Sequence, residues 1–236
     1  MSESILKFDK YSLKARIIPT VLTMVLPVFL FNHFYTSEEF SKLTGDLFGM
    51  KIISNLTISF VFMFFFSQFA RTFGKNVFES WYFKDELKMP TTEMLLHSSL
   101  SLTPDYRKKI YNKIKARFQI TLSTPEEEKE NEQLARRKIT EAISLIRKGL
   151  FNNSFLLQHN IEYGAMRNAI GGSVIGIFLS GFDFYFFYSI IYIHMAFVVS
   201  AILCGIYLLL ILFSKVIMNL YGKAYAKILI REFMGE

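Results

Sequence analysis

The sequence predicts an all-α integral membrane protein with four transmembrane helices and a central cytoplasmic helical segment. Of its 236 residues, 52% are hydrophobic and 26 are Phe, which is too apolar for an ordinary soluble domain. Residues 168–214 contain one carboxylate, Asp183, and no Lys or Arg. A bilayer core is ~30 Å thick and takes ~20 helical residues, so this stretch is long enough to cross it twice.

The charge distribution predicts the topology. Of the 27 Lys and Arg residues, 25 fall in residues 1–16, 71–167 and 215–236. Because basic flanks of membrane spans stay in the cytoplasm, these segments and both termini are expected on the cytoplasmic side of the membrane, which the chain crosses several times.

The first membrane hairpin is expected in residues 17–70, after a basic amphipathic N-terminus over residues 1–16. Its first span should run over 17–35, with a kink at the internal Pro27. Its second span, 52–70, places Asn55 and Ser59 on one face because they are four residues apart. Such polar groups either join helices or line a wet cavity, so these two are the pore-lining candidates.

Two soluble helices are expected within residues 71–167. Thr103-Pro104 and Thr124-Pro125 both give a capping hydroxyl followed by a proline at the first helical position. The first helix should run to Phe118 and the second to Gly149. Each has apolar residues at helical spacing on one face, which predicts a small packed core.

The second membrane hairpin is expected in residues 168–214. Asp183, preceded by Ser180 and Gly181, is interpreted as the tip between a third span and a fourth span over 185–213. Gly172, Gly176 and Ser180 recur every four residues and form a small face that lets another helix approach closely, within the chain or between copies. Residues 215–236 form a basic amphipathic cytoplasmic tail.

The sequence lacks the motifs of the common enzyme classes. It has no Gly-rich phosphate loop, no His-Glu-x-x-His and no Cys-x-x-Cys, and its four His residues are far apart. We therefore expect a protein that is not an enzyme, with no catalytic residue, no metal site and no cofactor.

A basic and aromatic group in the soluble segment is the candidate ligand site. Basic side chains neutralise phosphates and aromatic rings stack on bases, so this group could bind a nucleotide or oligonucleotide. The alternative is a solvated face near anionic lipid, where each Lys or Arg contributes ~1 kcal/mol. The group consists of Tyr106, Arg107, Lys108, Lys109, Tyr111, Lys113, Arg117, Arg136, Arg137 and Lys138.

A second polar group lies just before the third span, where it could couple the soluble helices to the membrane. It consists of Gln158, Asn160, Glu162, Tyr163, Arg167 and Asn168. A helix starting near Phe155 should carry these residues directly into the span. The structural alternative is an ordinary helix entrance in which Glu162 pairs with Arg167.

The stretch from Gln158 to Gly172, together with the plan of two spans, a cytoplasmic helical segment and two spans, resembles small membrane proteins of bacterial anti-phage operons. It is similar to the transmembrane effector of the Hailong system. This resemblance implies a homo-oligomeric pore controlled by an oligonucleotide that a companion nucleotidyltransferase makes.

Three functional hypotheses follow from these observations. The first is an oligomeric, ligand-gated pore or ion channel in the lipid bilayer. The second is a non-conducting scaffold whose basic surface binds anionic lipid or protein. The third is a small transporter, although four spans are few for that class.

Overall fold

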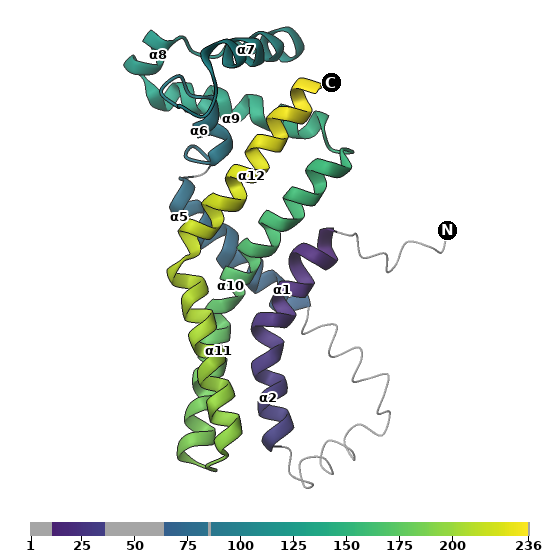
Figure 1. Cartoon of the computed structure of the whole chain (residues 1–236), viewed down its shortest axis with the longest axis vertical. Coiled ribbons are helices and arrows are strands. Elements are labelled where there is room, and N and C mark those ends of the chain that lie inside the picture. Colours follow the sequence, from purple (N-terminus) through teal and green to yellow (C-terminus); the bar gives the residue numbers. More distant parts are fainter. Residues whose placement is uncertain (1–10, 36–63, 85, 236) are drawn as a thin grey trace, which may run out of the picture. The chain divides into compact units, whose positions relative to one another are not determined.

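The computed structural model describes residues 11–35, 64–84 and 86–235, and in this region of the chain helices are joined by loops, with no strand (Figure 1). The all-α prediction is therefore confirmed for these residues. The pore-lining candidates Asn55 and Ser59 lie outside the described residues, as does most of the predicted second span. The chain divides into two compact units. We call Met1–Phe78 with Gly164–Ser214 the apolar unit, and Glu79–Tyr163 with Lys215–Glu236 the polar unit.

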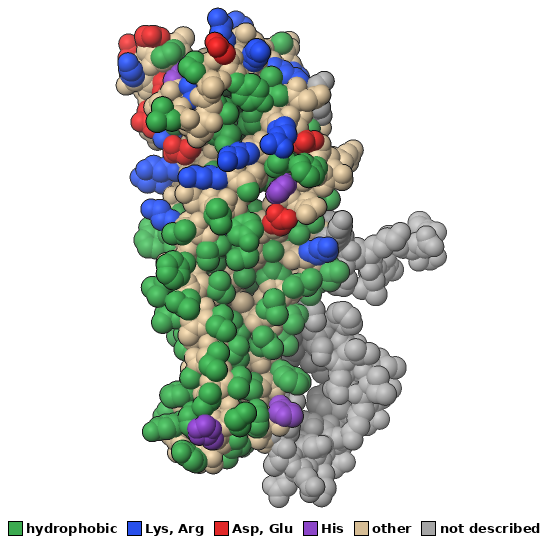
Figure 2. Space-filling view, viewed as in Figure 1, with side chains coloured by type: hydrophobic (Ala, Val, Ile, Leu, Met, Phe, Trp, Pro, Cys, Tyr) green, Lys and Arg blue, Asp and Glu red, His purple; other side chains and the backbone are tan. Residues whose placement is uncertain are grey.

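Three helices of the described chain are long and apolar enough to cross a membrane: Ser12–Tyr35, Ser154–Ser189 and His194–Leu212. Their composition indicates a membrane protein. Figure 2 shows hydrophobic side chains over almost all of the visible surface around α2 and α11. Large apolar side chains are exposed there, including Phe29 at 63%, Phe178 at 73% and Leu212 at 66%. A soluble protein would bury such a surface.

The first of these helices is a composite. It consists of η1 (Ser12–Ile17), α1 (Ile18–Thr20), η2 (Val21–Val25) and α2 (Leu26–Tyr35). The two η segments are π-helical, and each ends shortly before one of the buried prolines, Pro19 and Pro27. A proline ring collides with the carbonyl four residues earlier, and the wider π turn is one way for the helix to accommodate it.

A further helical stretch in the described chain begins in the apolar unit and ends in the polar unit. Residues 64–72 are helical, and η3 (Phe73–Glu79) and α5 (Ser80–Phe83) follow. The stretch ends at Lys84, whose φ of 45° is left-handed.

The second hairpin differs from the prediction at its tip. Helix α10 (Ser154–Ser189) is continuous from the predicted coupling group through Asp183, and α11 (His194–Leu212) begins after a turn at residues 190–193. Asp183 is therefore inside the helix, and its interpretation as the hairpin tip is wrong. The helix continues because the aromatic run after Asp183 is packed: Phe187 is fully buried, with ring centroids 5.7 Å from Phe31 and 6.1 Å from Phe34.

The polar unit contains α6 (Pro90–Leu95), α7 (Pro104–Phe118), α8 (Pro125–Glu130), α9 (Glu132–Gly149), the start of α10 and nearly all of α12 (Ser214–Gly235). The two predicted helix starts are confirmed. Thr103 accepts a hydrogen bond from the Tyr106 N–H, and Thr124 forms a reciprocal capping box with Glu127. The second predicted helix is broken at Asn131, whose side chain caps α9 by accepting from the Leu134 N–H.

One hydrophobic core holds the polar unit together, and it joins helices that are far apart in the sequence. Ile110 and Ile114 of α7 are fully buried, as the helical spacing predicted. The core also takes apolar residues of α6 and α9, and the end of α12 completes it. From α9 it takes Ile139, Ala142, Ile143 and Ile146, and from α12 it takes Ala226, Ile228, Leu229, Ile230 and Phe233.

Candidate functional site

A buried polar stripe follows one side of α10 inside the apolar unit. Asn168, Ser173 and Ser180 are fully buried and Asp183 is 3% exposed. Buried polar side chains are costly among apolar helices unless they find partners. The stripe is therefore the region of the described chain where a functional site is most expected. The hydrogen-bond partners of each residue indicate its role.

At its Asn168 end the stripe bonds a backbone carbonyl of the first helix. The Asn168 amide donates from Nδ2 to the Ala15 carbonyl oxygen at 2.6 Å. Ala15 lies in the π-helical segment η1, just before the buried Pro19. Asn168, predicted to belong to the coupling group, thus joins α10 to the first helix.

A tyrosine of α11 has the same role further along the first helix. The Tyr207 hydroxyl donates to the Leu22 carbonyl oxygen at 2.7 Å. In this segment the Leu26 N–H bonds to the Val21 oxygen, five residues back. In that π register the donor for Leu22 would be Pro27, which has no N–H. Two carbonyls of the first helix, those of Ala15 and Leu22, are therefore bonded by α10 and by α11.

The small-residue face of α10 is filled by the chain itself. A Cβ added at Gly172 would overlap Thr23 Oγ1. At Gly176 it would lie 2.6 Å from the Thr23 carbonyl oxygen and 2.9 Å from the Tyr207 ring. Ser180, the third member, is fully buried. Of the two uses predicted for this face, close approach within the chain is the one observed.

A second close approach was not expected from the sequence. A Cβ at Gly171 would overlap the Ala70 carbonyl oxygen and the backbone of Gly74, and one at Gly74 would overlap the Arg167 carbonyl oxygen. The helix over residues 64–83 thus crosses α10 with backbone against backbone. The adjacent Gly171-Gly172 pair was the signal, since it gives α10 two small faces.

At the Asp183 end of the stripe, the described residues offer no hydrogen-bond partner. Ser180 Oγ and Asp183 Oδ2 are buried and form no hydrogen bond there. Aromatic rings dominate this end: the Phe31 centroid is 5.7 Å from that of Phe182 and 5.1 Å from that of Phe186. The stripe therefore changes along its length, from bonded amide and hydroxyl groups to an unpartnered hydroxyl and carboxyl.

In the polar unit, two charged side chains hold the loop that precedes α7. Glu128 is 5% exposed and accepts from the backbone N–H groups of His97 at 2.8 Å and Ser98 at 2.9 Å. Burial acts to raise the pKa of Glu128, but these donors outweigh it and the pKa is lowered. Arg107 donates to the carbonyl oxygens of three loop residues, His97, Ser99 and Leu102.

Three residues of the predicted ligand group form structural contacts within the polar unit. Arg107 is 5% exposed, the Tyr111 hydroxyl donates to the Leu95 carbonyl oxygen at 2.8 Å, and Tyr106 packs against the core. Burial raises the pKa of Tyr111. These side chains position the loop and the core, a role that their spacing along the helix could not reveal.

Other cations of the predicted group differ in exposure. Lys113 Nζ lies 3.4 Å from the Met234 carbonyl oxygen, and Arg117 lies over the ring of Phe233. Arg136 bonds to Glu93 and Glu132. Burial acts to lower the pKa of Arg136, but the two carboxylates outweigh it and the pKa is raised. The members exposed to solvent besides Arg117 are Lys108, Lys109 and Arg137, and Lys138 is half-buried.

Four residues of the predicted coupling group, Gln158, Asn160, Glu162 and Tyr163, lie on the part of α10 that belongs to the polar unit. The Tyr163 hydroxyl donates to Glu79 Oε2 at 2.9 Å, and both residues are buried. Glu162 accepts from the Gln158 amide at 3.3 Å and lies 3.2 Å from His159 Nδ1. Asn160 is half-buried. The group is thus integrated into the fold around α10.

Within residues 11–35, 64–84 and 86–235, no group of three His, Cys, Asp or Glu side chains could hold a metal ion. Comparison of the chain with protein-family models, with curated proteins and with solved structures finds no match.

Proposed function

We propose that the chain is a gated, ion-conducting membrane protein with four spans, both termini in the cytoplasm and a cytoplasmic polar unit. The observation that supports it is the polar stripe of α10, which ends in an unpartnered hydroxyl and carboxyl among aromatic rings. Ionisable groups inside a span are rare, and those that occur usually mark ion or proton pathways. A scaffold that only binds lipid has no use for such a stripe.

Gating would use the helix that both units share. Helix α10 has 36 residues, and the polar unit contributes its start up to Tyr163 while the apolar unit contains it from Gly164 onward. A ligand that binds one state of the polar unit more tightly would shift the equilibrium of the spans by that difference in affinity. The resemblance to the Hailong effector makes a short oligonucleotide the ligand to test, and anti-phage defence in a bacterial inner membrane the setting.

The exposed cations of α7 are the candidate ligand contacts. Reversing Lys108 and Lys109 to Glu should weaken oligonucleotide binding and flatten its salt dependence by about 0.9 or less in the log–log slope per lost phosphate contact. The reversal of Lys148, an exposed lysine at the end of α9, is the matched control. If each reversed charge weakens oligonucleotide binding equally in both variants, the interaction is general charge attraction and not a specific site.

The direct test of conduction is ion flux in proteoliposomes with and without short oligonucleotides. We expect the ligand to change the flux, and the Lys108 and Lys109 reversal to remove that change. Absence of flux in both conditions, with tight binding to anionic vesicles, would favour the alternative of a membrane scaffold.

Assembly into a homo-oligomer would need a surface other than the filled face of Gly172 and Gly176. An open apolar groove between α10 and α11 offers small residues, and a Cβ at Gly181 or Gly205 meets nothing within 4 Å. Gly205→Leu should therefore leave the fold intact and reduce the oligomer measured by cross-linking in membranes. An unchanged oligomer would exclude the groove as the contact between copies.

Topology is tested with reporter fusions. Fusions after Ser2, near Ser123 and after Glu236 should report the cytoplasm, and one near Gly45 should report the outside. A periplasmic signal near Ser123 would end the four-span proposal.

A further inference from the structure

The polar stripe of α10 ends in two buried groups that form no hydrogen bond with the described residues. Asp183 is 3% exposed and its Oδ2 has no hydrogen-bond partner. Ser180 is fully buried, three residues earlier on the same side of α10, and its Oγ has no partner either. At the other end of the stripe, Asn168 bonds the Ala15 carbonyl through Nδ2 and leaves only its Oδ1 without a partner.

The surroundings of Asp183 are apolar and aromatic. Phe187, one turn along the helix, is fully buried, and its ring centroid is 5.7 Å from that of Phe31 of α2. Across the described chain, no ion pair involves Asp183. The titratable groups near this end of the helices are His33 and Tyr35 of α2, His194 of α11 and Tyr185 and Tyr188 of α10 itself, all of them exposed. Further along α11 lie Cys204, which is half-buried, and Tyr207, whose hydroxyl is bonded to Leu22.

An ionised carboxylate without a counter-ion is costly in such a place. Either a cation or a proton must neutralise it. Hard cations such as Ca²⁺ and Mg²⁺ take about six or more oxygen ligands. The described residues bring together the two carboxyl oxygens of Asp183 and the single hydroxyl of Ser180. A proton needs only one oxygen of the acid.

We propose that Asp183 is a proton-binding site within the apolar helices, with the neutral acid as the form held in the closed bundle. Release of the proton converts Asp183–COOH into a carboxylate and a free H⁺, and the carboxylate then requires water around it. Deprotonation therefore favours a hydrated, open arrangement of the helices, and the proton is a ligand of the closed one. This deepens the proposed function and rests on it for the link to opening, but occupancy by a proton can be tested without any flux.

The test uses dicyclohexylcarbodiimide, an apolar reagent that reacts with protonated carboxyl groups away from water. The purified full-length chain in proteoliposomes is labelled over a range of pH, and the modified residue is located by mass spectrometry. Asp183 should be labelled. Its labelling should fall roughly tenfold for each pH unit above the midpoint of its titration, as a single protonation equilibrium requires.

Matched variants make the result specific. Asp183→Asn should abolish the label, and Asp183→Glu, which keeps the acid, should retain it. Glu162, a carboxylate of α10 whose side chain is 41% exposed, should stay unlabelled in the same sample. Unfolding measured on each variant shows whether the helices still fold.

Two outcomes would overturn the proposal. One is a folded protein in which Asp183 is unlabelled at every pH. The other is labelling that Na⁺ or Ca²⁺ suppresses at constant pH, which would make the site a metal-cation site. Labelling without flux would retain the proton site and end the channel proposal, and flux without labelling would do the reverse.

Discussion

The hydrogen bond from Tyr207 to the Leu22 carbonyl gives a prediction with a defined sign, because the need for it arises from Pro27. Tyr207→Phe removes the donor and leaves a partly buried carbonyl without a partner. Side-chain hydrogen bonds between membrane helices contribute ~0.6 kcal/mol on average and up to ~1.7 kcal/mol, and an orphaned buried acceptor costs ~1–3 kcal/mol. We expect Tyr207→Phe to lower the free energy of unfolding by about 1–2 kcal/mol.

The same substitution should cost less when Pro27 is replaced. Pro27→Ala restores an N–H that can bond to a carbonyl of the preceding turn, so that carbonyl no longer depends on α11. The double-mutant cycle of Tyr207→Phe and Pro27→Ala should therefore give a coupling of about 1 kcal/mol, whereas independent sites add within ~0.3–0.5 kcal/mol.

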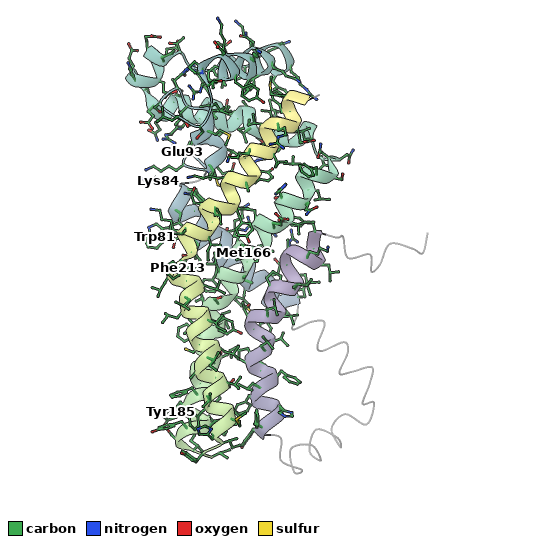
Figure 3. The ribbon with its side chains drawn as sticks, in the orientation of Figure 1. Trp81, Lys84, Glu93, Met166, Tyr185 and Phe213 are labelled. Atoms are coloured by element: carbon green, nitrogen blue, oxygen red, sulfur yellow. The ribbon has the colours of Figure 1, made fainter. Side chains whose placement is uncertain are left out.

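The assay is reversible unfolding in mixed micelles, followed by circular dichroism, for the wild type, both single variants and the double variant. Tyr185→Phe is the control. This tyrosine of α10 is 61% exposed near the turn to α11 (Figure 3), so its change should stay within ~0.5 kcal/mol. If Tyr207→Phe lowers the free energy of unfolding equally in the wild type and in the Pro27→Ala background, the explanation by a proline-freed carbonyl is refuted.

Three further predictions concern other contacts of the two units. Asn168→Leu should destabilise the apolar unit by ~1–3 kcal/mol because the Ala15 carbonyl loses its 2.6 Å donor, and a neutral result in the same unfolding assay would contradict that role. Gly176→Leu should destabilise it by ~1–3 kcal/mol or more, since its Cβ would lie 2.6 Å from the Thr23 oxygen, and wild-type stability would show that the helices are further apart. Glu128→Gln should destabilise the polar unit by ~1.5–3 kcal/mol at neutral pH. Because the folded pKa of Glu128 is lowered, its contribution is complete above the peptide value of ~4.3 and is lost as the pH falls through the folded value. The thermal midpoints of wild type and Glu128→Gln should therefore converge in acid, and a constant gap would refute the assignment.

The sequence was most informative where one segment carries its own signal. The capped starts at Thr103 and Thr124 and the apolar spacing of Ile110 and Ile114 depend on neighbours along the chain, and each is confirmed. The continuity of α10 from the coupling group into the apolar unit was predicted for the same reason.

The sequence was least informative where a residue depends on a distant partner. Asp183 after Ser180 and Gly181 resembles a turn, but the packing of Phe187 against the first helix keeps that stretch helical. Arg107 belongs to a basic run, which predicts a solvent-exposed cation. Its actual partners are carbonyl oxygens of the loop before α7, and the spacing of residues within the helix does not reveal them. The bond partners of Asn168 and Tyr207 lie in the first helix, more than a hundred residues earlier, where no local pattern reveals them.

The core of the polar unit also sets an order of events during synthesis. Ile110, Ile139 and Ile143 share one core with Ile230 and Phe233, which leave the ribosome only after both α10 and α11 have been made. Until then the nascent polar unit has an exposed apolar surface that holdase chaperones can bind. The two apolar helices are therefore available to the membrane insertion machinery before this unit can close, and a chain truncated ahead of Ala226 would be a substrate for proteolysis.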